Sequence, residues 1–368
     1  MESINTQIVI GGGERQDWLD NLKGIAICLM VIGHCGAPFT PWIFLFHMAV
    51  FYIAFGYCWN DKHIASFDSV KLYIWNKVKS LYLPFIFCNI VYLLFNNVFV
   101  ETGIYASTPD FLALIGSDDQ SLLHESFTIV QILRQAFLIC ILFGSTELGG
   151  PTWFFASLLV TSTFYILLRF LLRQYFSIKV STCIEILVAC SFLLIAWFIS
   201  ESKLNFHNSY INRLFESYLL LLLGVHLKTF DKKFKEPKRG LLVLIFVSAF
   251  SLLYYLNGLG SISMARCAIT NPMFFLLASI AGWYLLWSVS KLCSFRWLSY
   301  LGARTRAIVM WHFISFKAVS YLYLIIVGGN MLLLGCFPYI KSAPDYMWII
   351  YSVIGICLPC IIGAIYKN

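Results

Sequence analysis

The chain has 368 residues, of which 60% are hydrophobic and only 12% are charged, and its mean hydropathy is +0.79. Soluble domains contain roughly half apolar and about a quarter charged residues, so this composition excludes a water-soluble globular protein and indicates an integral membrane protein. The formal charge of +8 is therefore expected to mark cytoplasmic loops, and no nucleic-acid partner is predicted.

The N-terminal segment, residues 1–17, is polar and lacks the apolar core of a cleaved signal, so the first apolar run is expected to act as an uncleaved anchor. Each transmembrane helix needs about 20 apolar residues. We predict one all-α domain over residues 1–368, a polytopic helical bundle of about ten transmembrane helices with both termini in the cytoplasm. The ten apolar runs are 22–39, 42–59, 81–100, 152–172, 180–200, 211–227, 241–256, 272–290, 307–327 and 347–366.

The longest predicted outer connection, residues 101–150, is acidic and has Arg134 as its single basic residue. Long connections in compact proteins are often functional, so this one is expected to be either a lid over an acceptor site or a merely solvated loop. Its apolar stretch 129–143 is interrupted by Gln131, Arg134 and Gln135. We assign this stretch to an interfacial or re-entrant helix, with an eleventh span as the alternative.

The basic residues support ten spans, because short cytoplasmic loops collect Lys and Arg. When the N-terminus is placed inside, 20 of the 26 basic residues fall in the termini or in alternate connections on one side. An eleventh span would scramble this pattern. The basic residues that fall elsewhere are Arg134, Lys203, Arg213, Arg266, Lys317 and Lys341.

His34 is the strongest candidate for chemistry, because ionisable groups inside a membrane are costly and mark functional sites. Lys23 precedes it by eleven residues, which is close to three helical turns, so both share one helix face about 16 Å apart. Lys23 at the cytoplasmic boundary suits a phosphate of coenzyme A, and the His34 imidazole suits a general base. The competing interpretation is a lone histidine that only bonds a neighbouring carbonyl or headgroup.

Further motifs follow in chain order. The second run begins Phe46-His47-Met48-Ala49-Val50-Phe51, the third is preceded by a basic stretch from Lys71 to Pro84, the fourth opens with Pro151-Thr152-Trp153, and a late segment runs from Leu301-Gly302 through Thr305 to His312. Together with Asp20, Lys23 and His34, this ordered set resembles bacterial acyltransferase family 3, the multi-span O-acyltransferases that decorate polysaccharides, lipopolysaccharide, peptidoglycan and antibiotics. Here Lys23 replaces the commoner arginine, Ala49 a proline, and Thr305 a serine.

The resemblance implies a bacterial inner-membrane O-acetyltransferase that moves an acetyl group from cytosolic acetyl-CoA to a hydroxyl of a cell-surface or lipid-linked saccharide. It implies that His34 is the catalytic base and that Lys23 assists donor binding. Lys77 and Lys79 of the basic stretch are expected to contact donor phosphates. The supporting or acceptor-side residues are expected to be Asp20, His47, Trp153, Thr305 and His312.

Other functions remain open from the sequence alone. A secondary transporter or polysaccharide flippase would also have about ten helices, but such proteins usually show repeated halves, which this chain lacks. An acyltransferase that uses another acyl-CoA and a scaffolding subunit are further alternatives. Cys357 and Cys360 form a C-x-x-C without a second pair, so no metal is predicted.

Overall fold

The computed structural model describes residues 17–202, 209–231 and 237–365. The described part is built almost entirely of helices, as the sequence predicts, and its one sheet is a two-stranded antiparallel hairpin of β1 (Ile262–Ser263) and β2 (Ala268–Ile269). The predicted cytoplasmic tail, residues 1–17, lies outside the described residues except for Asp17. The helices are α1 (Asp17–Gly33), α2 (Thr40–Phe44), α3 (His47–Tyr57), α4 (Phe67–Lys77), α5 (Leu83–Leu94), α6 (Asn96–Glu101), α7 (Pro109–Ile115), α8 (Ile129–Cys140), α9 (Trp153–Tyr175), α10 (Ile178–Ser202), α11 (Ser209–Asp231), α12 (Arg239–Asn257), α13 (Pro272–Leu292), α14 (Arg296–Ala303), α15 (Thr305–Val327) and α16 (Met347–Ile365).

Seven helical segments of the described residues are long and apolar enough to cross a membrane. Helix α1 has only 17 residues, and α11 carries Arg213, Glu216 and Lys228. The segment Met347–Gly363 of α16 is a shorter apolar helix. The structure thus supports an all-α membrane protein, and the predicted number of ten spans goes beyond these seven. The seven segments are Thr40–Tyr57, Phe67–Leu94, Gly150–Tyr175, Ile178–Ser202, Arg239–Asn257, Pro272–Leu292 and Thr305–Val327.

The first two apolar runs are not continuous helices. Helix α1 ends at Gly33, six residues before the apolar run does, because Gly36 has a positive φ of 78° and Pro38 cannot continue the hydrogen-bond ladder. The second run is divided into α2 and α3. These breaks place His34 in a turn and His47 at the start of a helix.

The third predicted span also differs from the structure. The helix begins at Phe67 rather than near residue 81, and a π-helical turn, η2 (Val78–Tyr82), joins α4 to α5. Pro84 in the first turn of α5 has no N–H for a bond to Ser80, and a π-turn is a common way to absorb such a local mismatch. Hydropathy alone missed the first turns of this helix because Asp68, Lys71 and Lys77 interrupt the apolar pattern.

Residues 129–140 form the helix α8, and the polar residue Gln131, which interrupts the apolar pattern, helps to start it. The side chains of Thr128 and Gln131 each accept a hydrogen bond from the other's backbone N–H, which makes a capping box. The apolar side chains of Ile129 and Phe137 are 77% and 62% exposed, so α8 presents an apolar face to its surroundings.

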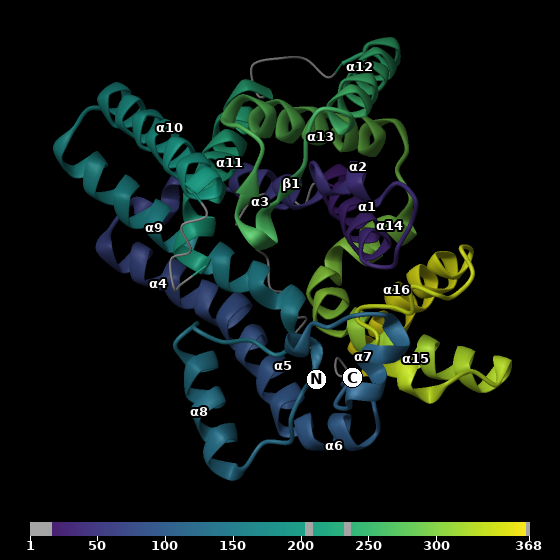
Figure 1. The fold of residues 1–368 in the computed structure, drawn as a ribbon. Helices are drawn as coiled ribbons and strands as arrows, with labels where there is room; N and C mark the ends of the chain where they lie inside the picture. Colours follow the sequence, from purple (N-terminus) through teal and green to yellow (C-terminus); the bar gives the residue numbers. More distant parts are fainter. Residues whose placement is uncertain (1–16, 203–208, 232–236, 366–368) are drawn as a thin grey trace, which may run out of the picture.

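Helices α3 and α11 pack closely and run in the same direction. Gly56 contacts the backbone of Leu221, and Gly224 contacts the backbone of Ile53, an approach that only small residues permit between membrane helices. Their C-terminal ends are joined as well, since the Tyr57 hydroxyl donates to Asp231 Oδ2 at 3.0 Å. Figure 1 shows both helices in the central part of the molecule, with α4, α9 and α10 on one side and α15 and α16 on the other.

Candidate active site

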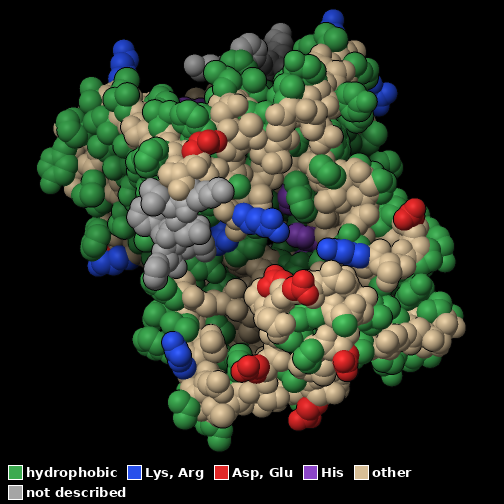
Figure 2. All heavy atoms as spheres, viewed as in Figure 1, with side chains coloured by type: hydrophobic (Ala, Val, Ile, Leu, Met, Phe, Trp, Pro, Cys, Tyr) green, Lys and Arg blue, Asp and Glu red, His purple; other side chains and the backbone are tan. Residues whose placement is uncertain are grey.

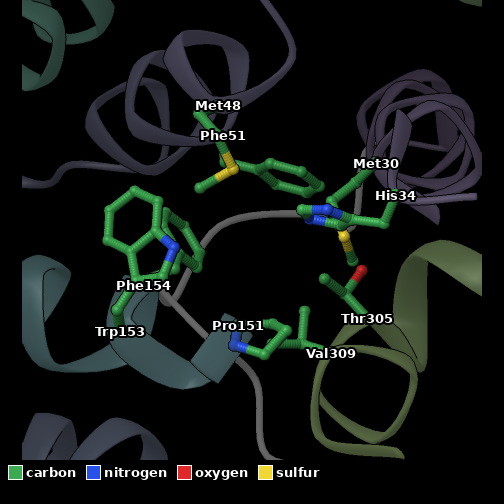
Figure 3. A pocket seen from close by; sticks show the side chains of 9 residues that line it. All are labelled: Met30, His34, Met48, Phe51, Pro151, Trp153, Phe154, Thr305 and Val309. Atoms are coloured by element: carbon green, nitrogen blue, oxygen red, sulfur yellow. The ribbon is translucent and has the colours of Figure 1, made fainter. Parts of the chain in front are cut away.

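A small cavity of about 20 Å³ lies where four parts of the chain meet. This volume has room for about one water molecule. Figure 3 shows His34 and Met30 on one side of the cavity and Trp153 and Phe154 on the opposite side. The lining residues are Met30 and His34 from α1 and the turn after it, Met48 and Phe51 from α3, Pro151, Trp153 and Phe154 from the turn η4 (Gly150–Thr152) and α9, and Thr305 and Val309 from α15.

His34 is held by its backbone and by ring contacts. Its N–H donates to the Val31 carbonyl at 3.0 Å, which continues the last turn of α1 into the cavity wall. Its ring centroid lies 5.5 Å from that of His312, with the two planes 26° apart, and 5.2 Å from Phe313, edge to face. Within the described residues no hydrogen bond to the imidazole of His34 is present, so its basic nitrogen stays open to a proton donor in the cavity.

His312 and His47 have their tautomers set by nearby carbonyls. In each case Nδ1 forms a hydrogen bond with the carbonyl oxygen of the residue four positions earlier. The distance is 2.9 Å from His312 to Ile308 and 3.0 Å from His47 to Ile43. A carbonyl only accepts, so each Nδ1 carries the proton and each Nε2 carries a lone pair. Nε2 of His312 is buried and has no hydrogen-bond partner in the described part of the chain. In the same part, no group of three His, Cys, Asp or Glu residues is arranged to hold a metal ion.

Lys23 lies on the cavity side of α1, seven residues and two turns before Met30. Its ammonium pairs with Asp20 Oδ1 at 3.0 Å, and the two side chains are 28% and 14% exposed. Asp20 thus acts on the same helix as Lys23, as an i,i+3 partner that orients the amine. Neither side chain lines the cavity itself.

The structure separates Lys77 from Lys79. The Lys77 ammonium lies 4.4 Å from the centre of the Phe55 ring, and Phe55 is one turn beyond Phe51 on the face of α3 that lines the cavity. Lys79 instead lies 5.2 Å from the ring of Trp75, which is 54% exposed. Lys77 is therefore the basic residue of this stretch that approaches the cavity from the α3 side.

Arg306 is a nearby cation that sequence reasoning used only to orient the chain. Its Nη1 atom donates to the Ser80 carbonyl at 3.5 Å, the acceptor that Pro84 leaves without an intrahelical donor. Arg306 follows Thr305, whose hydroxyl donates to the Gly302 carbonyl at 2.9 Å and whose side chain lines the cavity. The sequence signal for Arg306 is its position beside Thr305 at the start of an apolar helix.

Asn89 is a second residue that sequence reasoning missed. It is fully buried, its Nδ2 atom donates to Thr152 Oγ1 at 2.9 Å, and its Oδ1 atom accepts from the Thr146 N–H at 2.8 Å. These bonds fix the turn that carries Pro151 and Trp153 into the cavity. A buried polar residue in an apolar run was the available signal.

The face of the molecule seen in Figure 2 is hollowed near its centre. Histidine side chains are visible in the hollow, with Lys and Arg side chains on both sides and Asp and Glu side chains beside it. The hollow on this face therefore exposes histidine among charged side chains of both signs.

The fold and the site define a multi-helix membrane protein with a histidine-lined internal cavity. The family model described as an acyltransferase domain matches residues 16–366, essentially the whole chain. The chain therefore belongs to this acyltransferase family, and the resemblance to acyltransferase family 3 is confirmed. No curated protein and no solved structure matches it.

Proposed function

We propose that this membrane acyltransferase is an O-acetyltransferase that moves the acetyl group of cytosolic acetyl-CoA to a saccharide hydroxyl, with His34 as the general base. The observation that carries the proposal is the position of His34 in the wall of a small cavity, with its basic nitrogen free of partners among the described residues. Thr305, Trp153 and the rings of His312 and Phe313 surround it, which orients the imidazole and restricts water.

His34 takes the proton of the acceptor hydroxyl while the hydroxyl oxygen attacks the thioester carbonyl carbon. The tetrahedral intermediate then collapses, the carbon–sulfur bond breaks, and the departing thiolate of coenzyme A recovers the proton from the His34 imidazolium. The base thus returns to its starting state. The stacked ring of His312 holds the His34 ring in one orientation through both steps, and His47 supports α3 on the neighbouring wall.

On the donor side, cations from three elements suit the phosphates of coenzyme A. Lys23 of α1, Lys77 of α4 and Arg306 of α15 each lie beside a residue on a cavity-lining face. Lys79 is exposed and would contribute only at the rim. Long-range attraction by such a group favours an anionic donor even before close contacts form.

On the acceptor side, Trp153 offers a flat apolar ring opposite His34. We infer that a saccharide reaches this side from the hollowed face, and that the protein works in a bacterial inner membrane, where acetyl-CoA is available on the cytoplasmic side. Either a lipid-linked or a polymeric glycan fits this arrangement.

The test compares envelope glycans of three strains that lack the chromosomal copy and carry the wild-type chain, His34→Ala or His63→Ala. His63 is a matched control, because it packs against Trp59 and Tyr73 away from the cavity. We expect ester-linked acetate in the wild-type and His63→Ala strains and its loss, by at least about 100-fold, with His34→Ala. Equal acetylation in all three strains would show that His34 is not needed for the reaction. Absence of ester-linked acetate in the strain that carries the wild-type chain would refute glycan acetylation.

A further inference from the structure

A buried polar cluster lies beside the cavity, between α3, α9, α11 and the 262–269 hairpin. Its centre is Glu216 of α11, which is fully buried. Both carboxylate oxygens of Glu216 lack a hydrogen-bond partner among the described residues. Unpaired buried carboxylates are costly, so one that persists next to a candidate active site needs a ligand or a function.

The neighbouring Arg213 directs donors to the carbonyls of the hairpin. Its Nε atom donates to the Met264 carbonyl at 3.3 Å and its Nη2 atom to the Ala265 carbonyl at 2.5 Å. Burial, together with the Glu216 carboxylate, raises the pKa of the Cys267 thiol to about 12, while the Arg213 guanidinium opposes the rise. Glu216 therefore lies within electrostatic range of the hairpin, although no group there donates to it.

Along the axes of α3 and α11, Glu216 lies at the same level as the cavity. Helices α3 and α11 run parallel and cross at Gly56 and Gly224. Met48, which lines the cavity, and Glu216 each precede their glycine by eight residues, so both lie about 12 Å from the crossing in the same direction.

Trp153 forms the wall between the cluster and the cavity. Its ring lines the cavity opposite His34 (Figure 3), and the Arg213 guanidinium carbon lies 4.6 Å from the centre of the same ring. Phe154, the next residue, also lines the cavity and packs against Tyr52 of the cluster at 5.1 Å. The Trp153 ring therefore separates the cluster from the cavity, and a sugar would reach Glu216 from the cavity by moving this ring.

We propose that Glu216 is the acceptor-binding carboxylate of a saccharide subsite, in which its two oxygens accept hydrogen bonds from neighbouring sugar hydroxyls while the sugar packs against Trp153. The proposal rests on the proposed function, and it deepens it by naming the group that selects the acceptor. A carboxylate accepts up to about four hydrogen bonds and can therefore hold two adjacent hydroxyls at once. Such a pair of bonds depends on the configuration of the sugar, so Glu216 gives the site stereochemical selectivity.

A second buried glutamate shows what a purely structural role looks like in the same chain. Glu185 of α10 is also fully buried, but its Oε2 atom accepts from Arg169 Nη1 at 2.7 Å. It lies in a separate ion-pair network with Asp61, away from the cavity. Glu185 is therefore the matched control for Glu216.

The test measures binding first and chemistry second, on the full chain in lipid nanodiscs. Calorimetry with methyl glycosides of glucose, galactose, mannose and rhamnose gives affinities that need no acyl transfer. We expect at least one glycoside to bind, Glu216→Leu to weaken that binding about 10- to 100-fold because two hydrogen bonds to the sugar are lost, and Glu216→Gln to weaken it less. Glu185→Gln is expected to bind as the wild type does.

A second measurement separates acceptor binding from catalysis. It is the rate of acetyl-CoA hydrolysis without sugar, in which water takes the place of the acceptor hydroxyl. We expect Glu216→Leu to leave this hydrolysis within about twofold of the wild type and to raise the KM for the sugar. No glycoside binding by the wild type, unchanged binding by Glu216→Leu, or an equal loss of hydrolysis and transfer would each overturn the proposal. Sugar binding without any release of coenzyme A would instead support the subsite and refute the proposed acetyl transfer.

Discussion

Asn89 offers a sharp test of how the cavity wall is held. Replacing it with leucine keeps the approximate volume but removes its four hydrogen bonds, to the Phe85 carbonyl, to the Thr152 hydroxyl, and to the N–H and hydroxyl of the half-buried Thr146. Each lost hydrogen bond costs about 0.5–1 kcal/mol. We therefore expect Asn89→Leu to lower the free energy of unfolding by about 2–4 kcal/mol and to release the 146–152 turn.

Activity should fall more than stability alone explains, because Trp153 and Pro151 follow this turn into the cavity. We expect release of coenzyme A in the presence of acceptor to drop about 10-fold or more at temperatures where the variant stays folded. Asn97→Leu is the matched control. Asn97 also makes two bonds to backbone, to the N–H and carbonyl of Phe127, but these anchor the start of α8. Asn97→Leu should lower thermal stability and leave activity within about twofold of the wild type. If Asn89→Leu keeps full activity, or if Asn97→Leu loses as much, the turn does not position the site.

Three further predictions follow from contacts around the cavity. His312→Leu is expected to lower kcat about 10-fold, and His312→Phe to lower it less, because phenylalanine keeps a ring beside His34; equal losses would exclude a role in aligning the imidazole. Arg306→Gln should raise the KM for acetyl-CoA about 10-fold while Lys79→Ala changes it less than twofold, and the reverse order in steady-state kinetics would assign the donor contact to the exposed lysine. Gly56→Ala should destabilise the protein by about 1–3 kcal/mol, because its Cβ meets the Leu221 backbone, whereas Gly240→Ala, with open space around it, should show an unchanged melting temperature.

Sequence reasoning reached the helical fold and the residues that meet at the cavity. His34, Trp153 and Thr305 lie far apart in the chain, and all three line the same space. They were identified from an ordered set of motifs, and the order of spans brings such motifs together in a bundle.

Other parts of the site depend on local geometry that hydropathy does not encode. The helical phase of Lys77 and Lys79 is set by the π-turn at 78–82, and an unbroken helix would have placed their side chains differently. Asn89 and Arg306 act through single hydrogen bonds to distant backbone groups, and such pairings between helices cannot be deduced from one sequence.

Glu216 illustrates a signal that was present and passed over. An acid and a base three residues apart in an apolar run are rare, and they mark a polar interior face. Arg213 was noticed only as a basic residue on the unexpected side of the membrane. In the structure the hairpin carbonyls and the Trp153 ring surround its guanidinium.

The volume of the cavity has a consequence for the timing of the reaction. A space that admits about one water molecule has no room for the acetyl thioester and the sugar of the proposed reaction together, so part of the wall would have to move as these substrates enter. Met30 and Met48 stand on that wall, and their unbranched, flexible thioethers are the side chains that yield most easily. Under the proposed acetyl transfer, the thioester would meet the His34 imidazole only after an incoming substrate had made the space.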